Sequence, residues 1–236
     1  MFNYSKINNL SEVNIMVEIS ASLLNLEKEN ANRKLYDLEV AKIDYFHIDV
    51  MDGKFVPNNT TTLMKDYALT ITHISNMGLD VHLMVQDIES YVDEYLDLNP
   101  KIITFHIEES KDDKRTFDII NKIKENGAKV GIAISPNTEI EKIKKYLNHI
   151  HLVLVMTVEP GYGKQKLLSS TLEKIKELKK YIDENNISID IEADGGINEN
   201  TVEDVILAGA NILVVGSYLI YSDNYVETVK KLKSLD

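Results

Sequence analysis

The sequence contains no cysteine and no tryptophan among its 236 residues, and only four prolines. Without cysteine the chain can form no disulfide framework and no iron–sulfur cluster, and it has no thiolate nucleophile. Any metal ion must therefore be bound by histidine and carboxylate side chains. No apolar run approaches the roughly 18–20 residues of a membrane-spanning helix, and the N-terminus has no signal-peptide pattern. We therefore expect a cytoplasmic protein without a membrane partner.

Basic residues are also scarce, because 26 Lys and Arg stand against 38 Asp and Glu and the net charge is −12. This excess of acid argues against general binding of nucleic acids or anionic membranes, since phosphate contacts require a surface rich in Lys and Arg. It does not argue against one small phosphorylated ligand.

Eight short apolar runs rich in Val and Ile recur along the chain, separated by charged segments with helical spacing of apolar residues, such as 169–184 and 198–208. Strands that alternate with helices predict a parallel sheet covered by helices. Eight such units leave no room for a second domain, so we predict a single (β/α)8 TIM barrel over residues 17–236. Residues 1–16 form an N-terminal extension in this interpretation. The expected strands are 17–23, 45–50, 80–84, 102–107, 130–134, 152–156, 189–193 and 212–215.

Polar side chains gather where three of these strands end, which is where such barrels carry their chemistry. His47 and Asp49 alternate along HIDVMDG and so project from one face of their strand. His82 occurs in DVHLMV, and Asp194 precedes two glycines in IEADGG. A single inward His or Asp is more often an ordinary hydrogen-bonded core residue. Two imidazoles and two carboxylates together predict a divalent cation site for zinc, iron(II), manganese or cobalt.

One further acid and one further histidine are candidates for supporting roles. Glu192 shares the side of Asp194 one layer deeper, so we expect it to orient a ligand histidine through a hydrogen bond. His106 in TFHIEES can face inward, but we expect it to lack a paired carboxylate and to be structural or to support a ligand. The remaining histidines fall in helices or at helix–strand joints and indicate no function.

Glycines are concentrated in the loops after the sixth, seventh and eighth strands, in EPGYGKQ, DGGIN and GSYLI. Loops after the seventh and eighth strands of such barrels commonly bind phosphate through backbone N–H groups. A turn with positive φ explains any single glycine. Three adjacent loops together predict an anion site that includes Gly161, Gly163, Gly195, Gly196, Gly216 and Ser217.

The motifs HIDVMDGKFVPN, VHLMV, VMTVEPGYGKQ and IEADGGIN, followed by VGS, resemble in this order the ribulose-phosphate 3-epimerase family. The resemblance extends from SASLL at residues 20–24 to residue 217. It implies a barrel of the ribulose-phosphate-binding type that interconverts D-ribulose 5-phosphate and D-xylulose 5-phosphate in the pentose phosphate pathway with a divalent metal. It also implies a homo-oligomer.

Carried over residue by residue, the family's metal ligands fall on the four predicted ligands, His47, Asp49, His82 and Asp194, and its two acid/base carboxylates fall on Asp49 and Asp194. The resemblance places further substrate contacts on Ser22, Met51, His82, Met84 and Met156. It places the phosphate contacts on Gly161, Tyr162, Gly163, Lys164, Gly195, Gly196, Gly216 and Ser217.

Epimerisation at C3 removes the proton next to the C2 carbonyl and returns one to the opposite face, which two carboxylates on opposite sides of the sugar can do. The three methionines would cap the planar intermediate, although ordinary core packing explains any one of them as well.

Two departures from the family pattern leave alternatives open. Lys164 in GYGKQ stands where the family has a small residue, and Asn59–Thr62 replaces an aromatic–glycine pair after FVPN. The allulose-6-phosphate 3-epimerases also read YFHID and lack that pair, so D-allulose 6-phosphate is the alternative substrate. A decarboxylase on the same barrel would add an inward lysine that the second strand lacks. A non-catalytic sugar-phosphate binder would not need both carboxylates.

Overall fold

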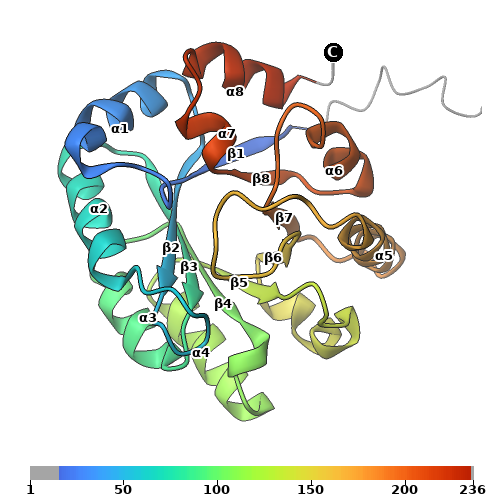
Figure 1. The fold of residues 1–236 in the computed structure, drawn as a ribbon. Coiled ribbons are helices and arrows are strands. Elements are labelled where there is room, and N and C mark those ends of the chain that lie inside the picture. Colours follow the sequence, from blue (N-terminus) through green and yellow to red (C-terminus); the bar gives the residue numbers. More distant parts are fainter. Residues whose placement is uncertain (1–15, 235–236) are drawn as a thin grey trace, which may run out of the picture.

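Eight parallel strands form a closed barrel in which each strand pairs with the next and β8 pairs with β1 (Figure 1). The computed structural model describes residues 16–234; residues 1–15, with nearly all of the predicted extension, and residues 235–236 lie outside the described part. The predicted barrel is confirmed, and every expected strand lies within two residues of its observed bounds. These are β1 (Glu18–Ser22), β2 (Tyr45–Met51), β3 (Gly78–Met84), β4 (Ile102–His106), β5 (Lys129–Ile134), β6 (Leu152–Met156), β7 (Asp190–Asp194) and β8 (Ile212–Val215).

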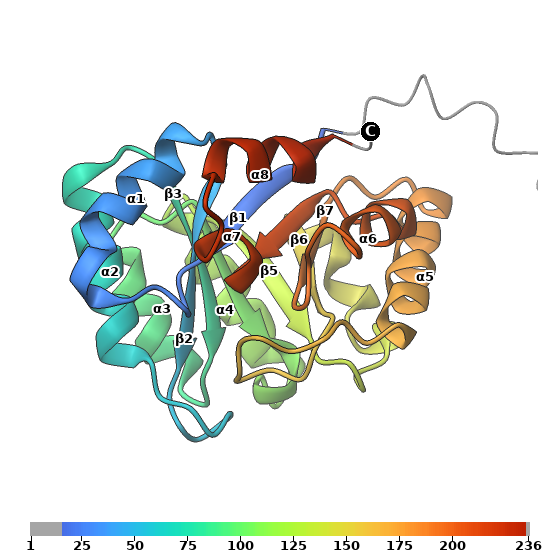
Figure 2. The same cartoon turned by 45° about the horizontal axis from the view of Figure 1, so that its top comes forward.

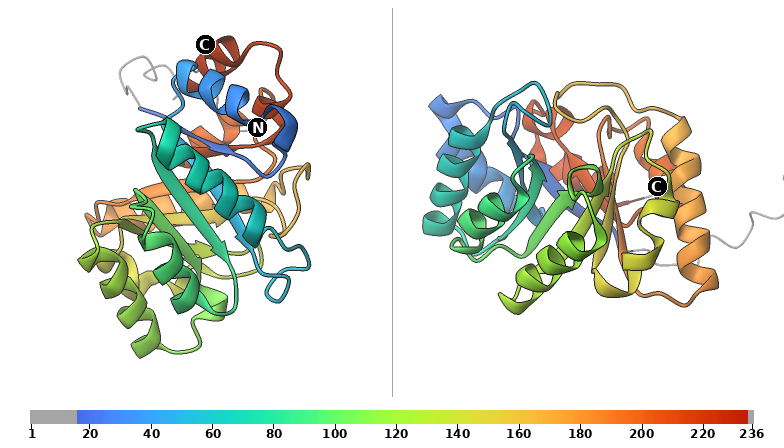
Figure 3. Two further views of the ribbon diagram at one scale, coloured as in Figure 1. Left: turned by 90° about the vertical axis from the view of Figure 1, so that its left-hand side faces the viewer. Right: turned by 90° about the horizontal axis from the view of Figure 1, so that it is seen from below.

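Helices surround the strands on the outside of the barrel (Figure 3). After β5 two 3₁₀ helices take the place of an α-helix. Between residues 16 and 234, no helix is both long and apolar enough to cross a bilayer. The helices are η2 (Lys28–Asn30), α1 (Ala31–Val40), α2 (Thr61–Ile74), α3 (Ile88–Leu96), η3 (Ile107–Glu109), α4 (Asp113–Glu125), η4 (Ile140–Lys142), η5 (Lys144–His149), α5 (Ser170–Glu184), α6 (Val202–Ala208), α7 (Ser217–Ile220) and α8 (Tyr225–Lys233).

Both faces of the strands are buried, which explains why they read as nearly continuous apolar runs. In β2 the side chains of Phe46, Ile48 and Val50 belong to the large core between barrel and helices. The alternate residues His47 and Asp49 are also buried but face the barrel interior, because successive side chains of a strand point to opposite sides. The strand period thus directs polar groups inward at the carboxyl end of β2.

Two loops meet over the carboxyl ends of the strands. The connections from β2 to α2 and from β6 to α5 extend at the same end of the barrel (Figure 2). The side-chain amide of Asn58 donates to the carbonyl of Gly161 at 2.7 Å. Gly161 has φ 109°, and a Cβ there would lie 2.9 Å from Cβ of Val56. The close approach of the two loops therefore requires glycine at this position.

Thr60 fixes the end of β2. Its buried hydroxyl donates to the backbone carbonyl of Asp49 at 2.5 Å and accepts from the N–H of Met51 at 2.9 Å. Its own N–H donates to the carbonyl of Met51 at 2.9 Å. The segment that departs from the family pattern thus holds the part of the strand that carries Asp49.

We expect the substitution Thr60→Val to lower the free energy of unfolding by about 1–3 kcal/mol, because it keeps the shape but leaves the N–H of Met51 without a partner. Denaturant titration followed by circular dichroism measures the change. Thr72→Val is the matched control, because the Thr72 side chain is exposed on α2. Loss of its hydroxyl should change the free energy of unfolding by less than about 0.5 kcal/mol. Equal stability of Thr60→Val and the wild type would contradict this role.

Candidate active site

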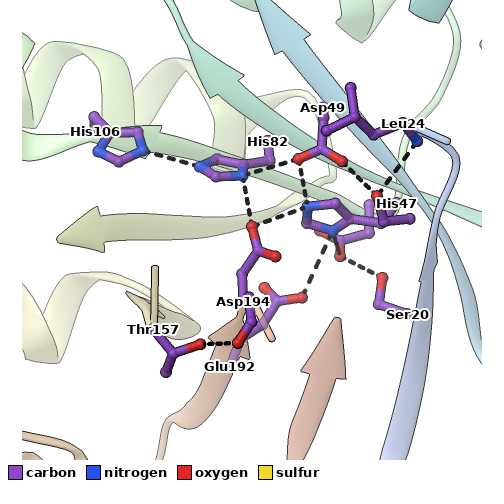
Figure 4. Close-up of polar contacts among 12 residues, drawn as sticks. Ser20, Leu24, His47, Asp49, His82, His106, Thr157, Glu192 and Asp194 are labelled. Carbon is purple, nitrogen blue, oxygen red and sulfur yellow. Dashed lines mark hydrogen bonds and ion pairs between the residues drawn. The ribbon is translucent and has the colours of Figure 1, made fainter. Parts of the chain in front are cut away.

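Four polar side chains from three strands converge inside the barrel near its carboxyl end (Figure 4). His47 and Asp49 come from β2, His82 from β3 and Asp194 from β7. The register places Asp49 beside His82 on the adjacent strand. One ligating atom from each residue lies within 4.8 Å of those from the other three. The structure therefore brings together all four predicted metal ligands.

The four ligating atoms lie close enough together to share one cation. His47 Nε2 lies 3.3 Å from Asp49 Oδ1 and 3.9 Å from Asp194 Oδ2. His82 Nδ1 lies 3.5 Å from Asp49 Oδ1 and 3.4 Å from Asp194 Oδ2. Ligands about 2.0–2.2 Å from a tetrahedral zinc ion lie about 3.3–3.6 Å from one another. Three of the four separations lie within this range and the fourth, between His47 and Asp194, is longer, so the cluster could hold one divalent cation.

Two of these atoms are buried and unpaired. His47 Nε2 and His82 Nδ1 have no hydrogen-bond partner within residues 16–234. An unpaired buried polar atom costs about 1–3 kcal/mol. A cation would use both lone pairs, so the residues present fit a metal ion.

The electrostatics of the cluster favour positive charge. Burial alone would lower the pKa of His47, but the carboxylates of Asp80 and Asp49 raise that pKa well above its usual value. Burial alone would raise the pKa of Asp49, but the imidazoles of His47 and His82 lower it more strongly. Asp49 is therefore ionised at neutral pH, and buried negative charge is stable only beside a compensating positive group.

Asp80 supports His47 from the adjacent strand. Its Oδ2 lies 2.6 Å from His47 Nδ1 and also accepts a 2.6 Å hydrogen bond from the Ser20 hydroxyl. The expectation that Glu192 orients this histidine is wrong, because Glu192 Oε1 lies 3.8 Å from His47 Nδ1. Burial and the charge of Asp80 raise the pKa of Glu192 well above its usual value, so Glu192 is the weaker acceptor. Sequence reasoning missed Asp80, although it has the same strand parity as His82.

His106 and Glu108 lie behind His82. His106 Nε2 is 3.0 Å from His82 Nε2, and His106 Nδ1 is 3.0 Å from Glu108 Oε2. The expectation that His106 lacks a carboxylate partner is therefore wrong. Burial lowers the pKa of His106. Burial alone would raise the pKa of Glu108, but His106, Thr138 and the N–H of Ser135 lower it to about 2.

A cavity of about 620 Å³ opens beside the cluster at the carboxyl ends of the strands. This volume is typical of sites for small ligands. Asp49 and Asp194 line it, whereas His47 and His82 are fully buried and do not. His82 is therefore the one predicted substrate contact that does not reach the cavity. The others line it: Ser22, Met51, Met84, Met156, Gly161, Tyr162, Gly163, Lys164, Gly195, Gly196, Gly216 and Ser217.

The three methionines contribute to the apolar part of this lining. Met51 and Met84 are paired across β2 and β3 and pack with Val56. Met156 belongs to a separate cluster inside the barrel and is paired with Asp194 across β6 and β7. All three are buried, so they expose little more than the surface that faces the cavity.

The glycines after β7 allow the backbone to approach the cavity closely. Gly195 and Gly196 have φ of 123° and 69°. A Cβ would lie 2.3 Å from Cγ2 of Val158 at the first position and 2.3 Å from N of Leu167 at the second. In the described part of the chain the N–H groups of Gly196 and Ser217 donate to no protein acceptor. Gly196 and Ser217 both line the cavity, so two free donors come from adjacent loops.

Lys164 is the only basic side chain among the described residues that line the cavity. It has a left-handed backbone with φ 61°. Its Nζ lies 4.8 Å from the centroid of the Tyr221 ring, within the range of a cation–π interaction. Sequence reasoning missed Tyr221 and Asn25 as lining residues, since neither belongs to a motif that signals a ligand.

Solved structures with similar folds include 3-hexulose-6-phosphate synthase from Salmonella typhimurium and tryptophan synthase from Mycobacterium tuberculosis. The first has a TM-score of 0.65 at 15% identity and covers 92% of this chain and 96% of that chain. The second has a TM-score of 0.65 at 10% identity and covers 94% of each chain. At these identities the similarity concerns the fold alone.

Curated relatives are much more similar in sequence. The ribulose-phosphate 3-epimerase of Methanocaldococcus jannaschii is 38% identical over 92% of this chain and 90% of its own length. The protein of that name from Bacillus subtilis is 38% identical over 86% of this chain and 91% of its own length. The one from Escherichia coli is 32% identical over 92% of this chain and 94% of its own length. The family model described as "Ribulose-phosphate 3 epimerase family" matches residues 18–220. The chain is therefore an isomerase that belongs to the ribulose-phosphate 3-epimerase family.

Proposed function

We propose that the protein interconverts D-ribulose 5-phosphate and D-xylulose 5-phosphate by proton transfer at C3. One observation carries the proposal: two carboxylates from different strands, Asp49 and Asp194, line one cavity beside two buried imidazoles. Proton abstraction next to a carbonyl needs a positioned base, and inversion needs an acid on the other face. The relatives of known name and the family match support the same reaction.

In this mechanism Asp49 and Asp194 exchange roles with the direction of the reaction. One carboxylate takes the C3 proton, and the other, protonated, returns a proton to the opposite face of the sugar. Ser22 donates a 2.7 Å hydrogen bond to Asp49 Oδ2 and so orients that carboxylate toward the cavity. A divalent cation held by the four predicted ligands would supply Lewis-acid stabilisation of the negative charge that develops on the substrate oxygens.

The other cavity residues position the substrate. The free N–H groups of Gly196 and Ser217 are donors for its phosphate, and Lys164 adds a positive charge at the same opening. The thioethers of Met51 and Met84 exclude water from the reacting carbons, which protects a reactive intermediate from solvent. The absence of a lysine near Asp49 among the residues that line the cavity disfavours the decarboxylase alternative.

The homo-oligomeric state and the cytoplasmic location stay predictions. Sedimentation velocity of the purified full-length chain tests the first, and a single species with the mass of one chain would contradict it.

Incubation with ribulose 5-phosphate in D₂O tests the reaction directly. We expect xylulose 5-phosphate to form and deuterium to appear at C3, because the carboxyl group that delivers a proton to the opposite face has exchanged with D₂O beforehand. Proton NMR follows both changes. Allulose 6-phosphate is the comparison substrate, and a higher kcat/KM for the hexulose would assign the alternative substrate. No exchange at C3 of either sugar would refute epimerase activity.

We expect Asp49→Asn or Asp194→Asn to reduce kcat by at least about 10³-fold, because each change removes an acid/base group and a predicted ligand. Asp118→Asn, an exposed position on α4, is the matched control and should retain full activity. Circular dichroism checks that all three variants are folded. Near-normal turnover by either active-site variant would sink the two-carboxylate mechanism.

The predicted cation is tested by elemental analysis of the purified protein before and after treatment with a chelator. We expect about one zinc, iron, manganese or cobalt ion per chain, loss of activity on its removal, and recovery when a divalent cation is added back. Full activity in protein verified as metal-free would contradict a role for the metal in the reaction.

A further inference from the structure

A line of buried polar groups continues from His82 away from the cavity. His82 Nε2 lies 3.0 Å from His106 Nε2, and the two ring planes differ by only 23° with their centroids 5.1 Å apart, so the rings meet edge to edge (Figure 4). His106 Nδ1 continues to Glu108 Oε2 at 3.0 Å. Glu108 Oε1 in turn accepts from the N–H of Ser135 at 2.8 Å and from the Thr138 hydroxyl. Both imidazoles are fully buried, so solvent cannot replace the partners of either ring.

The far end of this line fixes the direction of each hydrogen bond. The backbone N–H of Ser135 can only donate, so Glu108 must accept there. An ionised carboxylate has no proton to give, so His106 Nδ1 carries the proton in its contact with Glu108. The other nitrogen of the neutral His106 ring, Nε2, is then an acceptor. His82 must therefore donate through Nε2, which leaves the lone pair of its Nδ1 free.

That lone pair lies where the cation site needs it. His82 Nδ1 is the atom that faces Asp49 and Asp194, and it is one of the two unpaired buried nitrogens of the cluster. The opposite order of protons would put an N–H at this position, and an N–H cannot bind a metal ion. Which ring nitrogen binds a metal is set by the hydrogen bond of the other nitrogen.

We propose that Glu108, acting through His106, is a positioning residue that keeps the proton of His82 on Nε2 and presents its Nδ1 to the cation. The inference rests on the proposed function, because it assumes that the four-residue cluster binds a cation. Neither Glu108 nor His106 lines the cavity, so their effect reaches the site only through the order of protons.

Lys174 of α5 holds the loop that supplies both donors to Glu108. Its Nζ donates to the carbonyls of Ser135 and Thr138 at 3.0 and 2.7 Å, and to that of Pro136 at 2.6 Å. The loop after β5 is thereby fixed against the carboxylate. The direction of the hydrogen bond between His82 and His106 thus depends on the loop after β5 and on α5, which contact Glu108 rather than His82.

The isosteric substitution Glu108→Gln tests the proposal because it should reverse the two hydrogen bonds of His106, to residue 108 and to His82. The amide oxygen stays with the two donors of the loop, so the amide NH₂ must face His106 Nδ1. His106 then accepts through Nδ1 and donates through Nε2. This proton order opposes the His82 form that binds a cation through Nδ1.

The first measurement is the tautomer of His106 in full-length protein with ¹⁵N-labelled histidine, recorded by long-range ¹H–¹⁵N correlation with and without Zn²⁺. We expect the proton on Nδ1 in the wild type and on Nε2 in Glu108→Gln. A wild-type His106 with its proton on Nε2 would overturn the proposal, and this result needs neither substrate nor a folded variant.

The second measurement is the dissociation constant for Zn²⁺, obtained by competition with a chelator of known affinity. We expect Glu108→Gln to weaken binding by about 10–100-fold, the usual effect of losing a group that supports a metal ligand. Glu109→Gln is the matched control, since it removes the same charge from the neighbouring residue of η3 and should leave the affinity unchanged. Equal weakening by both variants, or none by Glu108→Gln, would overturn the proposal.

The two measurements separate this proposal from the proposed function. If the wild type binds no Zn²⁺ and epimerises neither sugar, the proposed function fails, and with it the purpose assigned to Glu108. If the wild type is an active metal-binding epimerase but His106 carries its proton on Nε2, only the positioning role fails.

Discussion

Burial of carboxylates on β2, β3 and β7 is the constraint on which the rest of the structure depends. Asp49 and Asp80 are buried carboxylates on adjacent strands, and they are stable there only because imidazoles and hydroxyls are within hydrogen-bonding distance. Asp80 pairs with Nδ1 of His47 and His106 pairs with Nε2 of His82, which leaves the other nitrogen of each predicted ligand histidine unpaired. The cluster with these two free nitrogens could therefore bind a cation.

Strand period made much of this site predictable from the sequence. The alternation of His47 and Asp49 along β2 and the position of Asp194 at the end of β7 were enough to place them at one end of the barrel interior. Asp80 was missed although it has the same parity as His82, because its role depends on the register. The pairing of His47 with Asp80 across β2 and β3 is a property of two strands together, and no single strand reveals it.

Glu108 was missed for a different physical reason. Alternation holds only while the chain is extended, and β4 ends at His106, after which η3 turns the chain. The side chain of Glu108 is therefore placed by a 3₁₀ turn, and its other partners, Ser135 and Thr138, come from a loop beyond β5. Glu192 lies on the side of the strand that its parity predicts, yet it does not bind the histidine. Burial beside Asp80 raises the pKa of Glu192 and makes it a poor acceptor, so Asp80 pairs with His47 instead.

An acidic protein that binds an anionic substrate must offset the repulsion between their negative charges, and the two ends of the cavity do so with different groups. In the proposed function the donors for the phosphate are the backbone N–H groups of Gly196 and Ser217, and Lys164 adds a positive charge at the same opening. At the reacting end the negative groups belong to the protein, and the two imidazoles direct different nitrogens toward the proposed cation site. His47 presents Nε2 because Asp80 accepts from its Nδ1, whereas His82 presents Nδ1 because its Nε2 meets His106. Barrels that are 10–15% identical to this chain share its fold. A shared fold does not determine which imidazole nitrogen carries the proton, so the chemistry of this chain depends on the side chains that neighbouring strands place beside each histidine.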